Sequence, residues 1–195
     1  MFTGLIAEKG KILSAKMSEI GKHLTISATE QFVNKIQVGD SVSINGVCQT
    51  AVKMQGATFQ TEVMPETLKK TTLNSLQASK NVNLELAMTL NMRLGGHLVQ
   101  GHIDAIGHII QIVNIGSYKE FYISYPIEQK KYLVLKGAVA IDGASLTVAD
   151  IYDKSFKVAL ISHTLSNTLF CEYKVGDRVN IEYDLIGKYV EQMMK

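Results

Sequence analysis

The chain has 195 residues, a net charge of +2 and 46% hydrophobic residues. This composition excludes a disordered chain, because it supplies enough apolar side chains for a core. Basic residues form nothing longer than doublets such as Lys69-Lys70, so the footprint of a nucleic-acid-binding surface is missing. Two lone cysteines, Cys48 and Cys171, are typical of a reduced protein. We expect a cytoplasmic location, without a signal peptide or a membrane span.

Alternation of apolar and polar residues with a period of two predicts half-buried antiparallel strands along the whole chain. The clearest cases are 42–44, 59–63, 82–86, 156–160 and 179–183. Turn signals such as Asn45-Gly46 and Asp142-Gly143 separate the strands. Short helical turns are expected at 67–76 and 163–170, and a one-faced helix from about residue 185. This pattern predicts an all-β sandwich or barrel and disfavours a Rossmann-type fold.

An internal repeat is the strongest organisational signal in the sequence, with matching residues a constant 97 positions apart. The matches include Gly4/Gly101, Asn45-Gly46/Asp142-Gly143, Thr50/Thr147, Thr67/Thr164 and Val82-Asn83-Leu84-Glu85/Val179-Asn180-Ile181-Glu182. They concentrate at glycines, turns and threonines, where backbone geometry and hydrogen bonding are most demanding. The chain is therefore predicted to be a duplicated domain divided near Gly95-Gly96, with halves 1–97 and 98–195.

The glycine- and histidine-rich segment 95–104 admits several interpretations. If it is a strand, His97 and His102 face opposite sides, and His108 lies roughly 20 Å from His102, which disfavours a metal site. No Lys-Ser or Lys-Thr pair follows the glycines, so a P-loop is rejected. A glycine-rich crossing between domains, with histidines present by chance, stays open as an alternative.

A second motif places a nucleophilic atom two residues before a threonine in each copy, as Cys48 and Thr50 and again as Ser145 and Thr147. In a strand, side chains two residues apart share a face. A hairpin turn explains the preceding Asn-Gly and Asp-Gly pairs, and Cys48 could be a small buried hydrophobe. Neither explanation accounts for the recurrence of both residue types in both copies.

A third motif pairs Thr67 with Thr164, each at the expected start of a short helix. Both threonines are predicted to be helix N-caps. Such a helix start also leaves backbone N–H groups near the surface, where a ligand carbonyl can accept from them.

Four segments together resemble the riboflavin synthase family, and the resemblance runs the whole length of the chain. They are the opening 1–6, the segment 95–104, the segment 141–148 and the ending 184–191. The first copy departs from the family's usual Cys-Leu-Thr-Val, because Gln49 and Ala51 follow Cys48 and Thr50 there.

The resemblance implies an all-β fold of two tandem antiparallel Greek-key β-barrels, with a short C-terminal helix at the contact of a homotrimer. It implies that two molecules of 6,7-dimethyl-8-ribityllumazine are dismutated to riboflavin and 5-amino-6-(ribitylamino)uracil, with no cofactor and no metal. Each active site would lie between the N-terminal barrel of one subunit and the C-terminal barrel of a neighbour. No nucleic acid or membrane is an expected partner.

Four residues are the catalytic candidates. His102 is preferred for proton transfer at the acidic 7-methyl group of lumazine, because imidazole titrates near working pH, and Thr147 could orient it. Ser145 and Cys48 are candidates to assist addition at the ring carbon, directly or through water. Lys136 resembles a ligand contact of the family, although an ordinary surface lysine before a turn would give the same sequence.

The substrate-binding candidates are distributed over both copies of the repeat. They are Gly4, Leu5, Ile6, Cys48, Gln49, Thr50, Glu62, Val63, Met64, Pro65, Glu66, Thr67, Gly101, His102, Ile103, Lys136, Ser145, Leu146, Thr147, Ile161, Ser162, His163, Thr164, Leu165 and Ser166. Matching pairs are expected to recognise the lumazine and ribityl groups common to both substrates. Pairs that differ are expected to assign donor and acceptor roles, namely Leu5/His102, Cys48/Ser145 and Glu66/His163.

Two other functions are alternatives to a lumazine-dismutating enzyme. Relatives within the family bind lumazine or flavin as light-emitting antenna proteins without turnover, but His97, His102, Ser145 and Thr147 together favour catalysis. The barrel domain of a flavin-dependent reductase would need a nucleotide-binding domain, and the sequence has no βαβ pattern or G-x-G-x-x-G motif.

Overall fold

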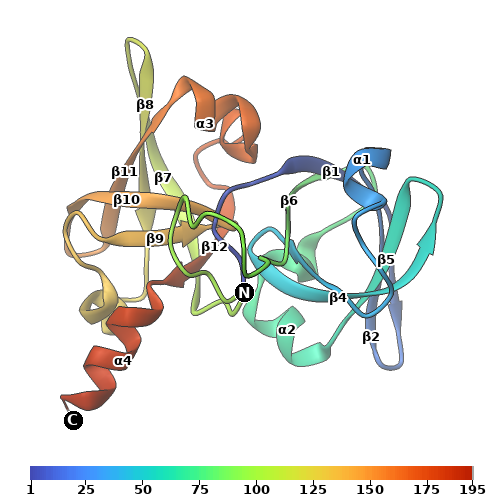
Figure 1. The fold of residues 1–195 in the computed structure, drawn as a ribbon. Coiled ribbons are helices and arrows are strands. Elements are labelled where there is room, and N and C mark those ends of the chain that lie inside the picture. Colours follow the sequence, from blue (N-terminus) through green and yellow to red (C-terminus); the bar gives the residue numbers. More distant parts are fainter. Residues whose placement is uncertain (195) are drawn as a thin grey trace.

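The computed structural model describes residues 1–194 as two closed, six-stranded antiparallel barrels that lie side by side (Figure 1). The N barrel consists of β1 (Glu8–Ser18), β2 (Gly21–Ser27), β3 (Ser41–Ile44), β4 (Val47–Gln55), β5 (Thr58–Val63) and β6 (Asn81–Leu86). The C barrel consists of β7 (Ala105–Ile115), β8 (Tyr118–Ser124), β9 (Ala138–Ile141), β10 (Ala144–Ile151), β11 (Ser155–Ile161) and β12 (Arg178–Tyr183). The neighbour order is β1-β2-β5-β4-β3-β6 in one and the equivalent β7-β8-β11-β10-β9-β12 in the other, both closed. The prediction of an all-β protein with two tandem barrels is confirmed.

Helices are short and mostly close the barrel ends. The α-helices are α1 (Glu30–Val33), α2 (Pro65–Lys70), α3 (Ser162–Asn167) and α4 (Leu185–Met193), and the 3₁₀ helices are η1 (Thr72–Ser75), η2 (Ile127–Tyr132) and η3 (Leu169–Cys171). The C-terminal helix begins at Leu185 as predicted, and the Asp184 carboxylate accepts from the Ile186 N–H at 3.0 Å. No helix in residues 1–194 is long and apolar enough to span a membrane.

Each barrel has its own hydrophobic core, because the alternating residues of its strands converge on its interior. The C barrel places Leu146 and Val158 inside, and both are buried. The N barrel has Gln49 and Thr61 at the matching positions, where the Thr61 hydroxyl donates to Gln49 Oε1 at 3.2 Å. Gln49, which departs from the pattern Cys-Leu-Thr-Val, is therefore accompanied by the polar Thr61, whose hydroxyl satisfies the buried amide oxygen of Gln49.

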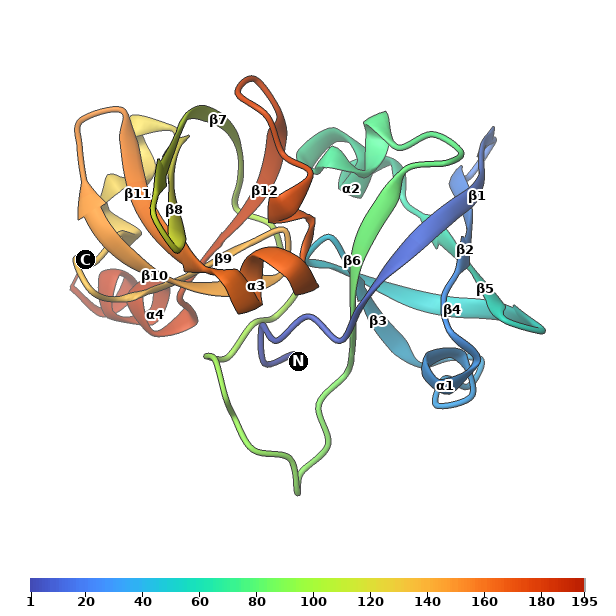
Figure 2. The same cartoon turned by 90° about the horizontal axis from the view of Figure 1, so that it is seen from above.

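The segments that precede the barrels exchange places. Phe2 and Val99 form an antiparallel bridge, with N–H to carbonyl distances of 2.7 Å and 3.1 Å, and both side chains are fully buried. Ile6 then packs on the core of the C barrel, and its repeat partner Ile103 packs on the core of the N barrel. Figures 1 and 2 accordingly show the N-terminus between the two barrels, beside the loop that connects them. The two halves of the 97-residue repeat are thus also related by an approximate twofold axis in space.

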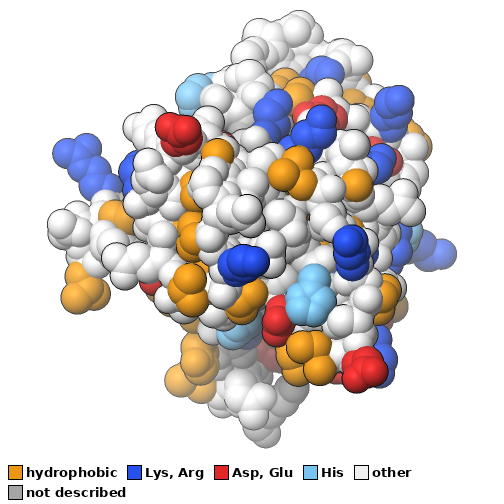
Figure 3. Space-filling view, turned by 90° about the vertical axis from the view of Figure 1, so that its right-hand side faces the viewer, with side chains coloured by type: hydrophobic (Ala, Val, Ile, Leu, Met, Phe, Trp, Pro, Cys, Tyr) orange, Lys and Arg blue, Asp and Glu red, His pale blue; other side chains and the backbone are white. Residues whose placement is uncertain are grey.

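Charge on the surface is dispersed. Figure 3, which faces the N barrel, shows Lys and Arg side chains mixed with acidic and apolar ones, without a continuous basic stripe. This face agrees with the absence of basic runs in the sequence.

Asp142 is a buried acidic residue near the axis. Asp142 is 2% exposed, its Oδ1 accepts from the Asn180 N–H at 2.9 Å, and its Oδ2 accepts from the Tyr173 hydroxyl. Burial raises the pKa of the Asp142 carboxyl from 3.8 to about 7, against the opposing effect of these donors. The matching residue in the N barrel is Asn45, which carries no ionisable group.

Asp142→Asn is expected to remove a pH dependence of stability. A folded pKa raised to about 7 means that the native protein favours the protonated acid, so its stabilising contribution is present below pH 4 and is lost as the pH rises towards 7. One pKa unit is worth about 1.4 kcal/mol, so the variant should gain on the order of a few kcal/mol over the parent between pH 5 and pH 8. Urea unfolding at several pH values measures this difference; parallel pH curves for the two proteins would contradict it.

Candidate active site

The two nucleophile–threonine pairs lie on the outer faces of strands β4 and β10. Cys48 and Ser145 are half-buried, Thr50 and Thr147 are exposed, and the residues between them, Gln49 and Leu146, point into the barrel cores. The expectation that each pair shares a face is confirmed. Gln49 and Leu146 therefore present only their backbone on the face that carries the nucleophiles.

A glycine from the opposite leading segment covers each nucleophile. The Ser145 N–H donates to the Gly4 carbonyl at 2.8 Å, and the Cys48 N–H donates to the Gly101 carbonyl at 2.9 Å. A Cβ on Gly4 would lie 2.5 Å from Ser145 Cβ, and a Cβ on Gly101 would lie 2.6 Å from Cys48 Cβ. Both glycines have positive φ, at +76° and +82°, so no other residue fits these approaches without strain. We name the groups around Cys48, Thr50 and Gly101 the N half-site, and those around Ser145, Thr147 and Gly4 the C half-site.

Two buried glutamates hold the glycine segments in place. Glu85 accepts from the N–H groups of Thr3 and Gly4 at 2.7 Å and 3.1 Å. Glu182, its repeat partner, accepts from the N–H groups of Gln100 and Gly101 at 2.6 Å and 2.9 Å. Burial raises the pKa of both carboxyls, that of Glu182 to about 7, and the backbone donors oppose this effect.

The C half-site contains a serine–histidine pair. His97 Nδ1 lies 2.7 Å from Ser145 Oγ, and the His97 N–H donates to the Thr3 carbonyl at 3.1 Å. His97 Nε2 is buried and has no hydrogen-bond partner in the structure. Burial lowers the pKa of the imidazole, with a smaller opposing effect from Asp184, so the ring is held neutral and can accept the serine proton.

His102 belongs to the other half-site. It is exposed and directly follows Gly101, which lies against Cys48 in the N half-site. Thr147, the residue predicted to orient it, is on β10 in the C half-site. Within one chain, His102 therefore follows the glycine that covers Cys48, whereas Thr147 lies two residues after Ser145 on β10.

Segment 95–104 is the glycine-rich crossing between the barrels that the sequence left open as an alternative, not a strand. Apart from the bridge at Val99, this stretch is irregular, because it crosses between the barrels and is held by Thr3, Phe2 and Glu182 rather than by a strand ladder. The residues described contain no cluster of three or more His, Cys, Asp or Glu arranged to hold a metal ion.

Thr67 and Thr164 are not N-caps, contrary to the prediction. Helix α2 starts at Pro65 and α3 at Ser162, so each threonine is the third residue of its helix. The capping threonines come four residues later, where Thr71 and Thr168 accept from the N–H groups of Leu73 and Phe170. Thr164 and Thr168 both precede a leucine, so in the C barrel only the backbone path distinguishes the capping threonine, while in the N barrel Thr71 precedes Thr72 and lacks that signal.

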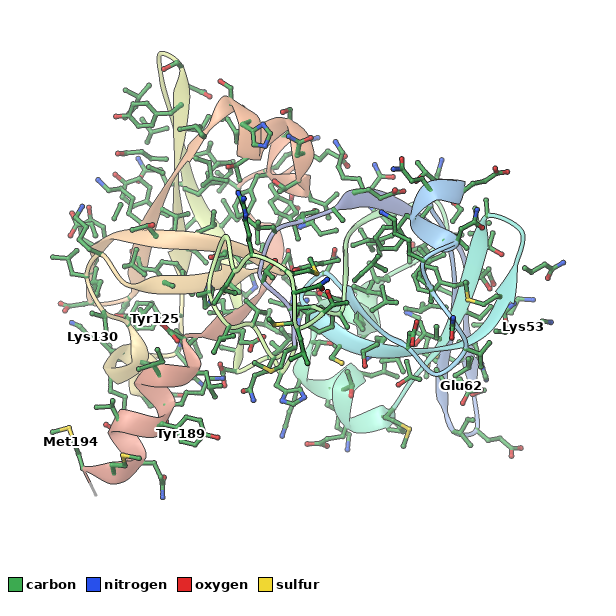
Figure 4. The ribbon with its side chains drawn as sticks, in the orientation of Figure 1. Lys53, Glu62, Tyr125, Lys130, Tyr189 and Met194 are labelled. Carbon is green, nitrogen blue, oxygen red and sulfur yellow. The ribbon has the colours of Figure 1, made fainter. Side chains whose placement is uncertain are left out.

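The other predicted binding residues lie on the two short helices and their approaches. Met64 directly precedes α2, and Pro65 and Glu66 are its first two residues, with Glu66 paired to Lys70 at 2.8 Å. Ile161 directly precedes α3, which contains Ser162, His163, Leu165 and Ser166. Glu62 points away from the junction between the barrels, beside His23 at 3.6 Å, and Val63 is fully buried in the N barrel (Figure 4). Neither Glu62 nor the Val63 side chain meets Cys48 in this structure.

Comparison with known protein families finds the same duplication. The model of the lumazine binding domain matches residues 3–87 and again residues 100–184. A riboflavin synthase of Actinobacillus pleuropneumoniae is 41% identical over 194 residues, which is all of this chain and 90% of the relative. The riboflavin synthase of Bacillus subtilis is 40% identical over the same shares, and that of Mycobacterium tuberculosis is 38% identical over all of this chain and 98% of its own.

The chain belongs to the riboflavin synthase family.

Solved structures give the same fold. The crystal structure of LumP complexed with riboflavin has a TM-score of 0.87 over 94% of this chain and 99% of that one, at 21% identity. The complex of LumP with 6,7-dimethyl-8-(1'-D-ribityl)lumazine has a TM-score of 0.84 at 21% identity, over 93% and 98% of the two chains. At this identity, the likeness establishes the tandem-barrel architecture alone.

Sequence reasoning missed three parts of this riboflavin synthase-family site. From the sequence, His97 is among the residues that favour catalysis but has no assigned role, and the 97-residue repeat offers it no partner that would point to Ser145. Glu85 and Glu182 are a repeat pair in the sequence, each directly after a core residue, Leu84 or Ile181, and so on the strand face turned away from its own core. This repetition of an acidic residue at the same strand position was the available signal.

His97→Gln and Ser145→Ala are expected to lower riboflavin formation by the same mechanism. Loss of a positioned base typically costs about 10²-fold or more in rate. If His97 acts through Ser145, the double variant should be little slower than Ser145→Ala alone, because the two groups work as a unit. Steady-state kcat and KM of the four proteins give the comparison, with His108→Gln, an exposed histidine on β7, as the matched control. If the loss of kcat in the double variant equalled the product of the two single losses, the two residues would act independently.

Proposed function

We propose that this riboflavin synthase-family chain dismutates two molecules of 6,7-dimethyl-8-ribityllumazine to riboflavin and 5-amino-6-(ribitylamino)uracil. A four-carbon unit passes from one lumazine to the other, and the two products together contain all atoms of the two substrates, so no co-reactant is required. The observation that supports this most directly is the repeated half-site, in which each nucleophile lies under a glycine from the opposite leading segment. Two related half-sites suit a reaction between two identical molecules.

We also propose the division of labour between the half-sites. In the C half-site, Ser145 Oγ adds to the ring carbon of one lumazine, directly or through a water molecule, while neutral His97 takes up the proton. In the N half-site, His102 removes a proton from the 7-methyl group of the other lumazine, next to Cys48. Matching groups such as Thr50 and Thr147 bind the portions that both substrates share.

A complete active site under this proposal joins the N half-site of one chain to the C half-site of another, in a homotrimer. This arrangement would also bring His102 to Thr147, which one chain leaves on different barrels. Helix α4 supports such a contact, because it exposes Ile186, Tyr189 and Met193, which are 64%, 59% and 82% accessible. Figure 4 shows Tyr189 and Met194 projecting from this helix, away from its own barrel.

Two further assignments complete the proposal. We divide the chain functionally into a lumazine-binding half at 1–97 and another at 98–195, in keeping with the two matched ranges 3–87 and 100–184. We assign the protein to the cytoplasm, because Cys48 and Cys171 are both free thiols and a reducing compartment preserves them.

Lys136 supports a binding role in the C half-site. It has a φ of +65°, a left-handed conformation that is unfavourable for lysine, whereas the matching residue in the N barrel is Gly39 at +99°. Its N–H donates to the Val148 carbonyl at 2.9 Å, directly after Thr147, and its side chain is exposed. The strained position therefore carries a cationic side chain in one copy only, which supports the proposed contact of Lys136 with the ligand.

Lys136→Gly is expected to separate stability from binding. The free energy of unfolding should stay the same or rise by about 1 kcal/mol, because glycine relieves the left-handed strain. KM for the lumazine should increase several-fold. Ser79→Gly is the matched control, since Ser79 has a φ of +72° where the other barrel has Gly176, and it lies outside both half-sites. An unchanged KM for Lys136→Gly would remove this lysine from the site.

The function itself is tested by incubating the purified protein with 6,7-dimethyl-8-ribityllumazine alone and following both pteridine and flavin by chromatography. Riboflavin should form at half the rate at which lumazine disappears, and Ser145→Ala should slow both. Tight lumazine binding without riboflavin would replace the proposal with a light-emitting antenna function. Absence of both binding and turnover would contradict either function.

A further inference from the structure

Four residues form a closed set of hydrogen bonds across the approximate twofold axis, which we name the inter-barrel ring: Asn45, Asn83, Asp142 and Asn180. The Asn83 N–H donates to Asn45 Oδ1 at 2.7 Å, and the Asn180 N–H donates to Asp142 Oδ1 at 2.9 Å. The ring closes between the barrels, because Asn83 Nδ2 donates to the Asp142 carbonyl at 2.9 Å and Asn180 Nδ2 donates to the Asn45 carbonyl at 2.8 Å.

The side chains of Asn83 and Asn180 hydrogen-bond only to the opposite barrel. Asn83 Oδ1 also accepts from the Leu169 N–H at 2.9 Å, and Asn180 Oδ1 accepts from the Thr72 N–H at 2.8 Å. Both side chains are 0% exposed, so every amide group has its partner on the other side of the axis. Contacts to their own barrels come from the backbone, which a side-chain substitution leaves in place.

The carbonyls that these side chains hold belong to the turns that precede the nucleophiles. Asn45 is three residues before Cys48, and Asp142 is three residues before Ser145. Both turn residues have positive φ, at +47° and +43°, and the following glycines touch each other, since a Cβ on Gly46 would lie 2.5 Å from the Gly143 nitrogen. The position of each turn is therefore fixed from across the axis as well as from its own strand.

We propose that Asn83 and Asn180 are crossed positioning residues: Asn180 of the C barrel sets the N half-site around Cys48, and Asn83 of the N barrel sets the C half-site around Ser145. Their importance for catalysis rests on the proposed function, whereas the crossed geometry does not. In an assembly that joins half-sites from different chains, the ring links two separate active sites through one subunit.

Thiol reactivity tests the crossing without any turnover. In a Cys171→Ser background, Cys48 is the sole thiol, and its rate of reaction with 5,5'-dithiobis(2-nitrobenzoate) reports on the N half-site. Asn180→Ala should change this rate several-fold, and Asn83→Ala should leave it within about twofold, although Asn83 is in the same barrel as Cys48.

The reciprocal series moves the reporter to the C half-site. With Cys171→Ser, Cys48→Ser and Ser145→Cys combined, the introduced thiol should respond to Asn83→Ala and remain insensitive to Asn180→Ala. Equal responses of both thiols to both variants would reduce the asparagines to a general structural role. A response confined to the asparagine's own barrel would overturn the crossed assignment.

Folding is controlled within the same experiment. Rates are measured well below each variant's melting temperature, and a serine replacement, which keeps one polar atom and leaves room for water, is used where alanine prevents folding. In the unmodified background, the alanine variants should lower kcat more than they raise KM. If the parent makes no riboflavin, the proposed function fails while the thiol result still decides the crossing.

Discussion

The exchange of leading segments between the barrels is the constraint on which the rest of the structure depends. Segments 1–6 and 98–103 run through the junction, where their backbone N–H groups would be costly to leave unpaired. Glu85 and Glu182 solve this problem, since each carboxylate accepts from two successive N–H groups of the glycine segment at 2.6–3.1 Å. The glycines are thereby held against Ser145 and Cys48. The same crossing of the leading segments therefore buries their backbone, pairs their N–H groups and places Gly4 and Gly101 over the two nucleophiles.

The two barrels are nearly symmetric in their backbone and hydrogen bonding, but their reactive side chains differ. The turns, glycines, glutamates and asparagines match across the axis, while the chemistry-bearing positions differ, with Ser145 opposite Cys48 and Asp142 opposite Asn45. His97 adds a base beside Ser145 and has no counterpart in the other half. Two identical substrates bound by matched frames can in this way meet different reactive groups, which is what a dismutation demands.

Burial sets the protonation states around the junction. Desolvation lowers the pKa of His97, which favours the neutral imidazole, and raises the pKa of the Asp142 and Glu182 carboxyls to about 7, well above their ordinary values. For His97, this provides a base that can accept a proton from serine. For Asp142, it places one ionisable group inside the inter-barrel ring at the position where the N barrel has a neutral amide.

The sequence by itself determined the fold class, the duplication with its offset of 97 residues, the C-terminal helix and the shared faces of Cys48 with Thr50 and of Ser145 with Thr147. These features follow from local periodicity and from turn residues, which act over a few positions along the chain. Only the tertiary structure decided that the leading segments cross, that His97 meets Ser145 while His102 follows the glycine above Cys48, and that Thr71 and Thr168 are the capping threonines. The crossing of the leading segments and the meeting of His97 with Ser145 join residues dozens of positions apart, and their geometry comes from how the two barrels close on each other. The threonine caps are local, but the place where each helix starts depends on the backbone path.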